Sequence, residues 1–205
     1  CVMPHILEHR GCWYAFGFGI PADATGDERF GTCYSSPDLK VWTKREFLPL
    51  PGVVTHTHGR DVIYNAKHKQ FTALGEAYGT SVAFYTSPTP LGPYHKEPDA
   101  HPVFGLPGDS VLFADDDGTA YLIYNSFAGP VPQRFTYIYQ LNDEYTDIIP
   151  SSLTNTSHVM EGLWMFKRDK TYYLMGSPLV SYDVADDFYL TAPSPLGPWD
   201  YRGLF

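Results

Sequence analysis

The sequence predicts an all-β protein, a β-propeller built from four-stranded blades. Three observations support this prediction: an aromatic-rich composition, a hairpin pattern that recurs about every fifty residues, and a Pro-bearing turn that follows three of the hairpins. The 205 residues include 16 Tyr, 13 Phe, 18 Gly and 18 Pro. Aromatic side chains favour half-buried strands, and Gly and Pro mark the turns between strands. No long window shows the three-and-four spacing of an amphipathic helix.

Four segments share one pattern, in which an apolar strand is followed by a polar turn and an aromatic-rich strand. The segments begin at His5, Asp61, Ser110 and Leu163. Their turns read HRG, NAKHK, DDDG and RDK, and such residues favour hairpin connections. The first aromatic residues after the turns are 58, 50 and 51 residues apart, at Trp13, Phe71, Tyr121 and Tyr172. This period is that of a repeat protein.

A second element recurs after three of the hairpins. It reads YSSPDLKVW at Tyr34–Trp42, YTSPTPLGPY at Tyr85–Tyr94 and LTAPSPLGPW at Leu190–Trp199, whereas the third repeat has YIYQLNDEYTDI. Each unit therefore holds about four short strands, which is the size of a propeller blade. We predict a single domain over 1–205, with blades at about 1–50, 51–104, 105–158 and 159–205. A sandwich with coincidental similarity is the alternative.

Composition and charge exclude several function classes. The formal charge is −9, and no basic run exists that would neutralise the phosphates of a nucleic acid or of an anionic membrane surface. No apolar segment approaches the roughly 18 residues of a membrane span. Buried free thiols are favoured over a Cys12–Cys33 disulfide. The NTS sequon at Asn155–Ser157 favours a secreted or extracellular protein.

Two of the innermost strands are preceded by an acidic residue. Asp109 lies 12 residues before Tyr121, and Glu161 lies 11 residues before Tyr172. The residue before the first strand of a blade lies at the mouth of the channel, so both carboxylates are expected to face one cavity. Carboxylate pairs across a pocket perform glycoside hydrolysis, in which one acid protonates the leaving oxygen. Alternatively, each acid is solvated or accepts backbone N–H bonds.

Further polar residues are expected around the same cavity. The candidates for substrate contacts are His5, His58, Arg60, Asp61, Asn125 and Ser177. Arg60 alternatively pairs with Asp109 or Glu161 across the channel. We predict no metal site, because His56 and His58 have no visible third ligand. DDDG at 115–118 is interpreted as a hairpin turn rather than a calcium loop, and Trp164 is assigned to the core.

The segment MEGLWMFKRDKTYYLMGS (Met160–Ser177) resembles the part of glycoside hydrolase family 43 that carries the catalytic acid. GDSVLFADDDGTAYLIYNS (Gly108–Ser126) resembles the part that carries the modulating Asp, and SPLGPW is also usual there. The resemblance covers essentially the whole sequence and implies a five-bladed propeller, with about four blades in this chain. It implies that Glu161 is the general acid. Asp109 would be its modulator, because a second negative charge nearby favours the protonated acid.

One position departs from the family pattern. Enzymes of this family invert the configuration at the anomeric carbon and use a third carboxylate, an Asp at the start of the first blade, as the base. In this sequence Met3 of MPHI stands at the position expected for that Asp. CYSSPDLKVW and TSPTPLGPY resemble a branch that lacks this Asp, the exo-β-1,3-galactanases of subfamily 24. In that branch a Gln in the last blade is assigned to hold the water. Val2 and His58 depart from that branch, which has a His and a Glu there.

These resemblances imply an inverting glycosidase that releases terminal sugars from a plant-type glycan, with exo-β-1,3-galactanase as the best interpretation. The alternatives are an arabinofuranosidase or xylosidase of the same family, or a carbohydrate-binding propeller without activity. The expected partner is an oligosaccharide or polysaccharide. No cofactor is required, and a structural calcium ion stays open. We expect the native start of the protein, and at least one further blade, to lie outside this sequence.

Overall fold

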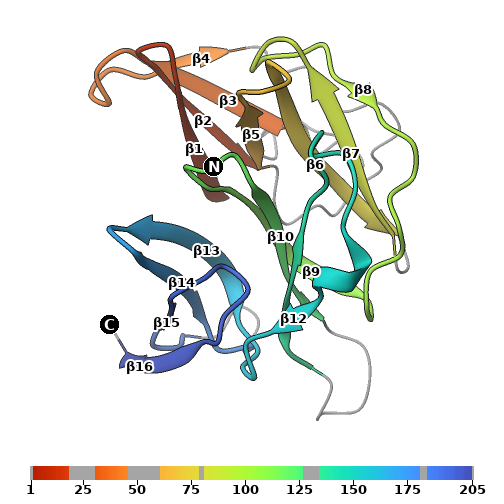
Figure 1. The fold of residues 1–205 in the computed structure, drawn as a ribbon. Coiled ribbons are helices and arrows are strands. Elements are labelled where there is room, and N and C mark those ends of the chain that lie inside the picture. The colour runs from red at the N-terminus through yellow and green to blue at the C-terminus, as the bar shows by residue number, and fades with distance from the viewer. Residues whose placement is uncertain are drawn as a thin grey trace, which may run out of the picture.

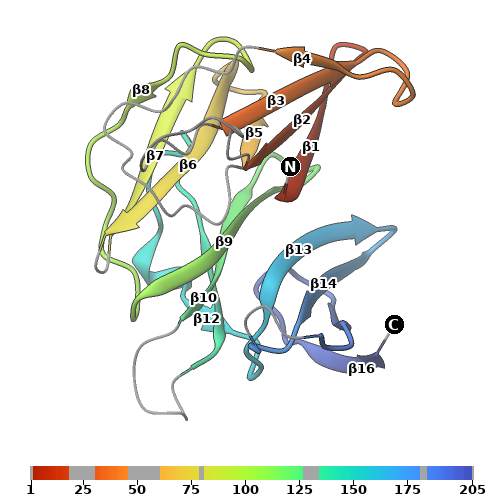
Figure 2. The same ribbon diagram turned by 180° about the vertical axis from the view of Figure 1, so that it is seen from behind.

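The computed structural model describes residues 2–18, 31–45, 61–78, 81–126, 134–180 and 184–204. These residues form four antiparallel sheets of four strands each. Figures 1 and 2 show the four sheets set around a common centre, which is how the blades of a propeller are arranged. The predicted fold class, an all-β propeller of four-stranded blades, is therefore confirmed.

The strands follow chain order within each blade. Blade 1 contains β1 (Val2–His9), β2 (Cys12–Phe18), β3 (Gly31–Ser36) and β4 (Thr43–Arg45). Blade 2 contains β5 (Val62–Asn65), β6 (Gln70–Tyr78), β7 (Ser81–Ser87) and β8 (His95–Lys96). Blade 3 contains β9 (Pro107–Ala114), β10 (Ala120–Ser126), β11 (Thr136–Gln140), the 3₁₀ turn η2 (Pro150–Ser152) and β12 (Thr154–Asn155). Blade 4 contains β13 (Glu161–Arg168), β14 (Thr171–Ser177), β15 (Phe188–Ala192) and β16 (Asp200–Leu204).

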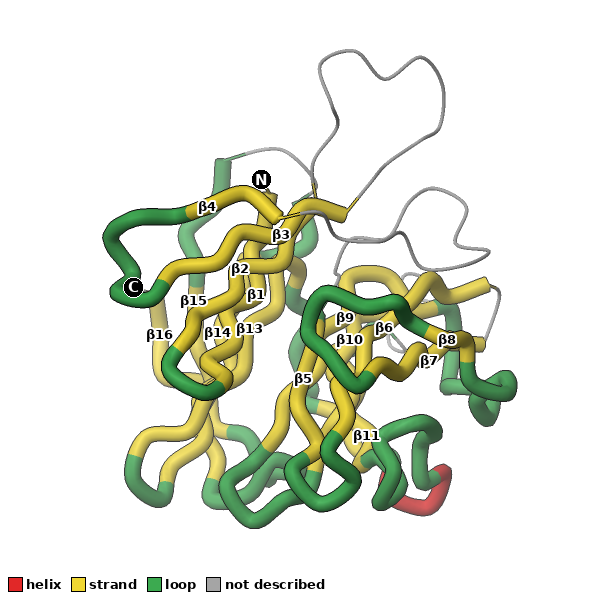
Figure 3. Tube along the Cα trace, turned by 90° about the horizontal axis from the view of Figure 1, so that it is seen from above, coloured by secondary structure: helices red, strands yellow, loops and turns green. Residues whose placement is uncertain are grey.

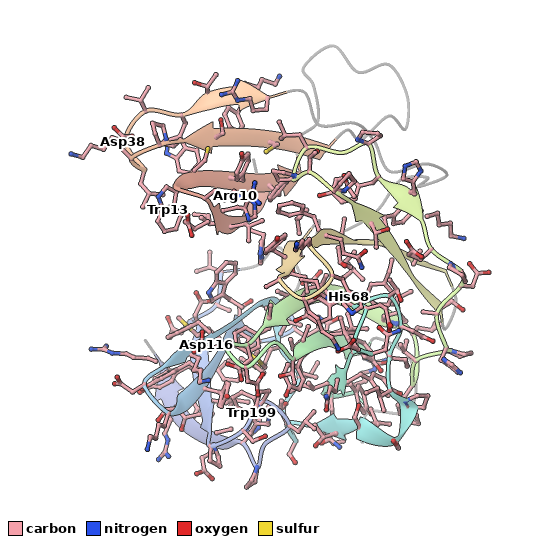
Figure 4. All side chains as sticks on the ribbon, turned by 45° about the horizontal axis from the view of Figure 1, so that its top comes forward. Arg10, Trp13, Asp38, His68, Asp116 and Trp199 are labelled. Carbon is pink, nitrogen blue, oxygen red and sulfur yellow. The ribbon has the colours of Figure 1, made fainter. Side chains whose placement is uncertain are left out.

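The repeated hairpins are formed by the first two strands of each blade. The aromatic residues that set the repeat are each the second residue of the second strand: Trp13, Phe71, Tyr121 and Tyr172. Figure 4 labels one residue in each of three hairpin turns, Arg10, His68 and Asp116, and shows these turns facing the centre. The hairpin turns therefore surround one end of the channel, and the starts of the innermost strands lie toward its other end.

The innermost strands pack against one another in the order β1, β5, β9 and β13. Figure 3 shows these four strands next to each other near the middle of the molecule. Apolar side chains fill the space between neighbouring blades. Phe16 and Phe71 lie in the cluster between blades 1 and 2, Leu74 and Leu122 lie between blades 2 and 3, and Leu174 lies between blades 3 and 4. Burial of these side chains is the main force that holds the blades together.

The outer turns of blades 2 and 4 share the motif found in the sequence and one hydrogen-bond pattern. The Gly92 N–H donates to the Thr89 carbonyl at 3.2 Å, and the Gly197 N–H donates to the equivalent Ser194 carbonyl at 2.9 Å. Blade 3 departs as its sequence predicts. There the side chain of Asn142 accepts the N–H of Thr146 at 2.8 Å and closes a different turn.

Cys12 and Cys33 are free thiols, as expected, and Cys33 is buried. Burial raises the pKa of the Cys33 thiol to about 12, so this group is unreactive at neutral pH. In the part of the chain that the structure describes, no helix has the length and apolar character needed to span a bilayer.

Candidate active site

Asp109 and Glu161 are brought together where β9 of blade 3 packs beside β13 of blade 4. The Oδ2 atom of Asp109 accepts the N–H of Gly162 at 2.9 Å. The carboxylate of one blade therefore lies against the peptide that follows Glu161 in the next blade. The equivalence of the two positions in the repeat, which motivated their pairing in the sequence, corresponds to a direct contact between the strands that carry them.

A bulge at the start of β13 makes this contact. The pairing of β13 with β14 shifts register between Glu161 and Trp164, and Gly162 has a φ of +64°. Residues other than Gly rarely adopt this left-handed backbone conformation, because it is unfavourable for a residue with a Cβ atom. The bulge gives the Gly162 N–H to Asp109, so the Glu-Gly pair of the sequence has a structural reason.

Glu161 makes two contacts in the described structure, one through its side-chain Oε1 and one through its backbone carbonyl. Its Oε1 accepts the N–H of Val180 at 3.1 Å. Ser177 faces Glu161 across the hairpin, and its hydroxyl lies 3.5 Å from the Glu161 carbonyl. Among the residues that the structure describes, neither Glu161 nor Asp109 forms an ion pair. His58 and Arg60, the other predicted substrate contacts of blade 2, lie outside the described residues.

His5 and Asp61 form a second polar pair further along the channel. Asp61 is 5% exposed, and its Oδ2 accepts the N–H of Leu112 at 2.6 Å. Its Oδ1 lies 3.3 Å from Nδ1 of His5. That nitrogen is buried, and it is not aligned for a hydrogen bond at this distance. Both residues were predicted near the channel, but the sequence gave no indication that they pair.

A cavity of about 430 Å³ is lined by the innermost strands of all four blades. This volume suits a small ligand. Its lining includes His5, Tyr64, Phe113, Trp164 and Phe166. Neither Asp109 nor Glu161 is among its lining residues, and the lining extends to Asp115 and Asp116 at the hairpin end, so this cavity is separate from the junction of the two acids.

The assignment of Trp164 to the core is wrong. The side chain is 37% exposed, lines the cavity and lies 5.6 Å from the ring of His5. Alternation along β13 is interrupted by the bulge after Glu161, so the face of Trp164 could not be counted from the sequence.

The expected substrate contact of Asn125 is also wrong. Asn125 is 0% exposed, and its Nδ2 donates to the Met160 carbonyl at 2.8 Å. It lies on β10, which is separated from the channel by β9. Its observed contact instead ties blade 3 to the residue that precedes Glu161.

The sequence did not reveal the buried cluster around Asp115 at the hairpin end of the channel. The side chain of Asp115 is 2% exposed and accepts Nζ of Lys167 at 2.7 Å and the hydroxyl of Tyr172 at 2.5 Å. The N–H of Asp116 also donates to it, at 2.7 Å. Burial opposes ionisation of Asp115, but these donors and the Lys167 charge outweigh burial and hold its pKa below the ordinary value. The sequence feature that could have indicated this cluster is the acidic Asp115 at the hairpin turn of blade 3 together with Lys167 near the hairpin turn of blade 4.

His68, Asp143 and Glu144 lie close enough together to hold a cation at the surface between blades 2 and 3. However, Asp143 already contacts Lys67 at 2.5 Å and His68 at 2.8 Å. Residues 115–118 form the hairpin turn between β9 and β10, as predicted for DDDG.

No family model matches the chain. A β-D-galactofuranosidase of Aspergillus niger is 30% identical over an alignment of 198 residues, which covers 84% of this chain and 56% of that protein. An arabinoxylan arabinofuranohydrolase of Paenibacillus polymyxa is 25% identical over an alignment of 211 residues, gaps included, which covers 83% of this chain and 33% of that protein. The chain is similar to glycosidases. It spans between a third and just over half of the length of these relatives.

Solved structures of glycosidases share the fold. The exo-β-1,3-galactanase of Phanerochaete chrysosporium with galactose superposes with a TM-score of 0.79 at 25% identity, over 98% of this chain and 49% of that chain. An endo-1,4-β-xylanase of Bacteroides thetaiotaomicron superposes with a TM-score of 0.72 at 25% identity, over 98% of this chain and 72% of that chain. A β-1,3-galactosidase of glycoside hydrolase family 43 superposes with a TM-score of 0.76 at 22% identity, over 98% of this chain and 75% of that chain. The chain therefore has the propeller fold that these glycosidases share.

Proposed function

We propose that the chain is the catalytic propeller of an inverting, exo-acting glycoside hydrolase of the family 43 type. The observation that carries the proposal is the junction of β9 and β13, where Asp109 contacts the peptide bonded to Glu161 at 2.9 Å. The similarity to glycosidases in sequence and fold supports it. Within the described residues, which do not include Arg60, neither acid has a cation beside it, and this suits proton transfer better than a structural ion pair does.

In this proposal Glu161 is the general acid. Its Oε1 accepts the N–H of Val180, so Oε2 is the oxygen that carries the proton to the leaving group. Asp109 is the modulator in this proposal, and its Oδ2 holds the N–H of Gly162, the residue that follows the acid. Protonation of the leaving oxygen contributes typically about 10²–10⁴-fold to such reactions.

For the substrate we propose a terminal sugar of a galactose-, arabinose- or xylose-containing glycan, with β-1,3-galactan as the first choice. The superposition on the galactanase supports that choice. The curated relatives, by their names, act on galactofuranosides and arabinofuranosides, and they support the alternative. An extracellular location is part of the proposal, because Asn155 of the NTS sequon is exposed. A structural calcium ion would be additional and is not required by this chemistry.

The test is release of reducing sugar from β-1,3-galactan, arabinan and xylan by the wild type and by Glu161→Gln. Glu144→Gln, an exposed Glu outside the channel, is the matched control. We expect the wild type and the control to act on one of these glycans and Glu161→Gln to lose that activity. Activity that survives Glu161→Gln unchanged would contradict the proposal.

The second candidate, a carbohydrate-binding propeller without activity, is favoured by one observation, Met3 at the expected base position. Calorimetric binding of the same glycans by the wild type, without release of sugar, would support it and overturn the hydrolase proposal.

A further inference from the structure

We infer that Thr136 and Asn125 of blade 3 position the acid Glu161, because they hold both ends of Met160, the residue that precedes it. The inference rests on the proposed function and adds two positioning residues to it. Thr136 is the first residue of β11, and Asn125 lies near the end of β10. Both residues are 0% exposed, so they act through the backbone of the acid rather than on the substrate.

The two residues face each other across the β10–β11 ladder and bind the same residue. Asn125 and Thr136 are partners in the antiparallel pairing of these strands, so their side chains lie on one face of the sheet. The Nδ2 atom of Asn125 donates to the Met160 carbonyl at 2.8 Å, and Oγ1 of Thr136 accepts the Met160 N–H at 3.1 Å. One cross-strand pair therefore bonds both backbone groups of Met160.

The contact to Met160 also accounts for an amide at position 125. The Oδ1 atom of Asn125 is buried, and it has no hydrogen-bond partner among the described residues. A buried acceptor without a donor is unfavourable, so an apolar side chain would fill this place at lower cost. Within the described part of the chain, the Nδ2 contact to Met160 is the one that uses the amide.

Thr136 also binds the chain that leads to Met160 through its own backbone. Its N–H donates to the His158 carbonyl at 2.7 Å, and its carbonyl accepts the Thr156 N–H at 3.0 Å. The N–H, the carbonyl and the hydroxyl of Thr136 are thus each bonded to a residue within 156–160. The side chain of Met160 is 0% exposed and packs in the apolar cluster between blades 3 and 4. The entry into β13 is therefore attached to blade 3 immediately before the acid.

Glu161 lies between two residues that blade 3 holds. On its other side, Asp109 accepts the N–H of Gly162 at 2.9 Å. The pairing of β13 with β14 shifts register between Glu161 and Trp164, so regular strand pairing alone does not fix this part of the backbone. The strand β14 limits movement within blade 4, because a Cβ atom on Gly176 would lie only 2.7 Å from the Glu161 carbonyl oxygen.

Holding the peptides on both sides of Glu161 fixes the direction of its Cα–Cβ bond and hence the region that its carboxyl group can reach. A general acid must approach the leaving oxygen to about 2.6–3.2 Å. A displacement of about 1 Å, caused by a residue away from the chemistry, can lower the rate by about 10²-fold. Loss of either contact to Met160 should therefore impair proton donation and leave substrate binding intact.

The experiment measures kcat and KM of the full-length protein on two substrates. One is the glycan that the wild type hydrolyses, and the other is an aryl glycoside of the same sugar, whose leaving group needs no proton. The variants are Thr136→Val, Thr136→Ser and Asn125→Ala, each checked by urea unfolding. Val has the shape of Thr without its hydroxyl, whereas Ser keeps an acceptor for the Met160 N–H.

We expect Thr136→Val and Asn125→Ala to lower kcat on the glycan by about 10²-fold with KM unchanged. On the aryl glycoside the loss should be much smaller, because that reaction does not depend on the position of the acid. Thr136→Ser should keep kcat close to that of the wild type. A merely structural role would lower the turnover of both substrates equally, since only the amount of folded protein would change.

Two buried residues of blade 2 provide matched controls. Thr72 is 0% exposed, and its Oγ1 has no hydrogen-bond partner among the described residues, so Thr72→Val removes a hydroxyl without breaking such a contact. Asn65 is 1% exposed, and its Nδ2 donates to the carbonyl of Asp143 in the next blade at 2.8 Å, but at the hairpin end of the channel. We expect Asn65→Ala to lower stability, and both controls to keep the wild-type ratio of the two kcat values.

Two results would overturn the inference alone, with Glu161→Gln still losing activity mainly on the glycan: equal losses on the two substrates in Thr136→Val, or wild-type kcat in both Thr136→Val and Asn125→Ala. If Asn125→Ala does not fold, Thr136→Val compared with Thr136→Ser decides. If neither Asn125→Ala nor Thr136→Val folds, the contacts serve the fold and the inference fails. If the wild type releases no sugar, or Glu161→Gln keeps its activity, the proposed function fails and this inference fails with it.

Discussion

The junction between blades 3 and 4 carries acidic residues at both of its ends, and the carboxylates at the two ends have different hydrogen-bond donors. At the strand-start end, Asp109 accepts one backbone N–H and Glu161 accepts another, at 2.9 and 3.1 Å. At the hairpin end, Asp115 accepts Lys167, Tyr172 and a backbone N–H. Among the described residues the first pair of acids has no side-chain donor, whereas Asp115 has two side-chain donors and one backbone donor.

In the proposed function, this difference separates a reactive carboxylate from a structural one. A buried carboxylate that is neutralised and fully bonded stabilises the fold and has no capacity left for proton transfer. Both ends join the same two strands, so the hairpin-end cluster also helps to hold β9 and β13 at the spacing that the other end needs.

The largest effect is expected at the strand-start end. Glu161→Gln should lower kcat on an unactivated glycan by about 10²–10⁴-fold, because the leaving oxygen loses its proton donor. On an aryl glycoside whose leaving group needs no proton the loss should be much smaller. Steady-state kinetics on both substrates checks this, and equal losses on the two would break the assignment of an acid.

The next effect is on stability at the hairpin end. Asp115→Ala should lower the free energy of unfolding by about 2–3 kcal/mol, because Lys167 and Tyr172 lose their shared acceptor. Asp116→Ala is the matched control, since the Asp116 side chain is 89% exposed and should change the free energy by less than about 0.5 kcal/mol. Urea unfolding measures both, and equal effects would contradict the distinction between a buried and an exposed acid.

A pH dependence sharpens the same contrast. The pKa of Asp115 is lowered in the folded state, so its contribution to stability is present above the unfolded pKa of about 3.9 and is lost as pH falls through the lower folded value. The difference in unfolding free energy between the wild type and Asp115→Asn should therefore be largest near neutral pH and should shrink below about pH 4. A difference that stays constant down to pH 2 would show that ionisation of Asp115 is not involved.

The smallest effect is expected at the hairpin end of the neighbouring junction, between blades 2 and 3. There Asp143 contacts Lys67 and His68, but its side chain is 52% exposed. Asp143→Asn should change the free energy of unfolding by less than about 1 kcal/mol, because solvent screens exposed pairs. A loss as large as that of Asp115→Ala would show that burial does not set the strength of these contacts.

The parts of this molecule that follow from local pattern were predictable from the sequence. Hairpin turns and strand periodicity gave the blades, and the equivalent positions of Asp109 and Glu161 placed both acids at one junction. The parts that depend on a register shift or on contacts between blades were not. The bulge at Gly162 exposes Trp164, and the packing of β9 against β13 joins Asp115 to Lys167 across 52 residues of sequence. Neither feature has a signature within a single strand.

The most direct test of the central claim, that Asp109 and Glu161 act as one catalytic unit, is a double-mutant cycle on kcat. The variants are Asp109→Asn, Glu161→Gln and the double variant, each checked for wild-type stability by urea unfolding. We predict that Asp109→Asn lowers kcat when Glu161 is present but lowers it little further in the Glu161→Gln background. The reason is that the effects of residues that act as a unit are non-additive. Losses that multiply in the double variant would show that the two carboxylates act independently and would contradict the account.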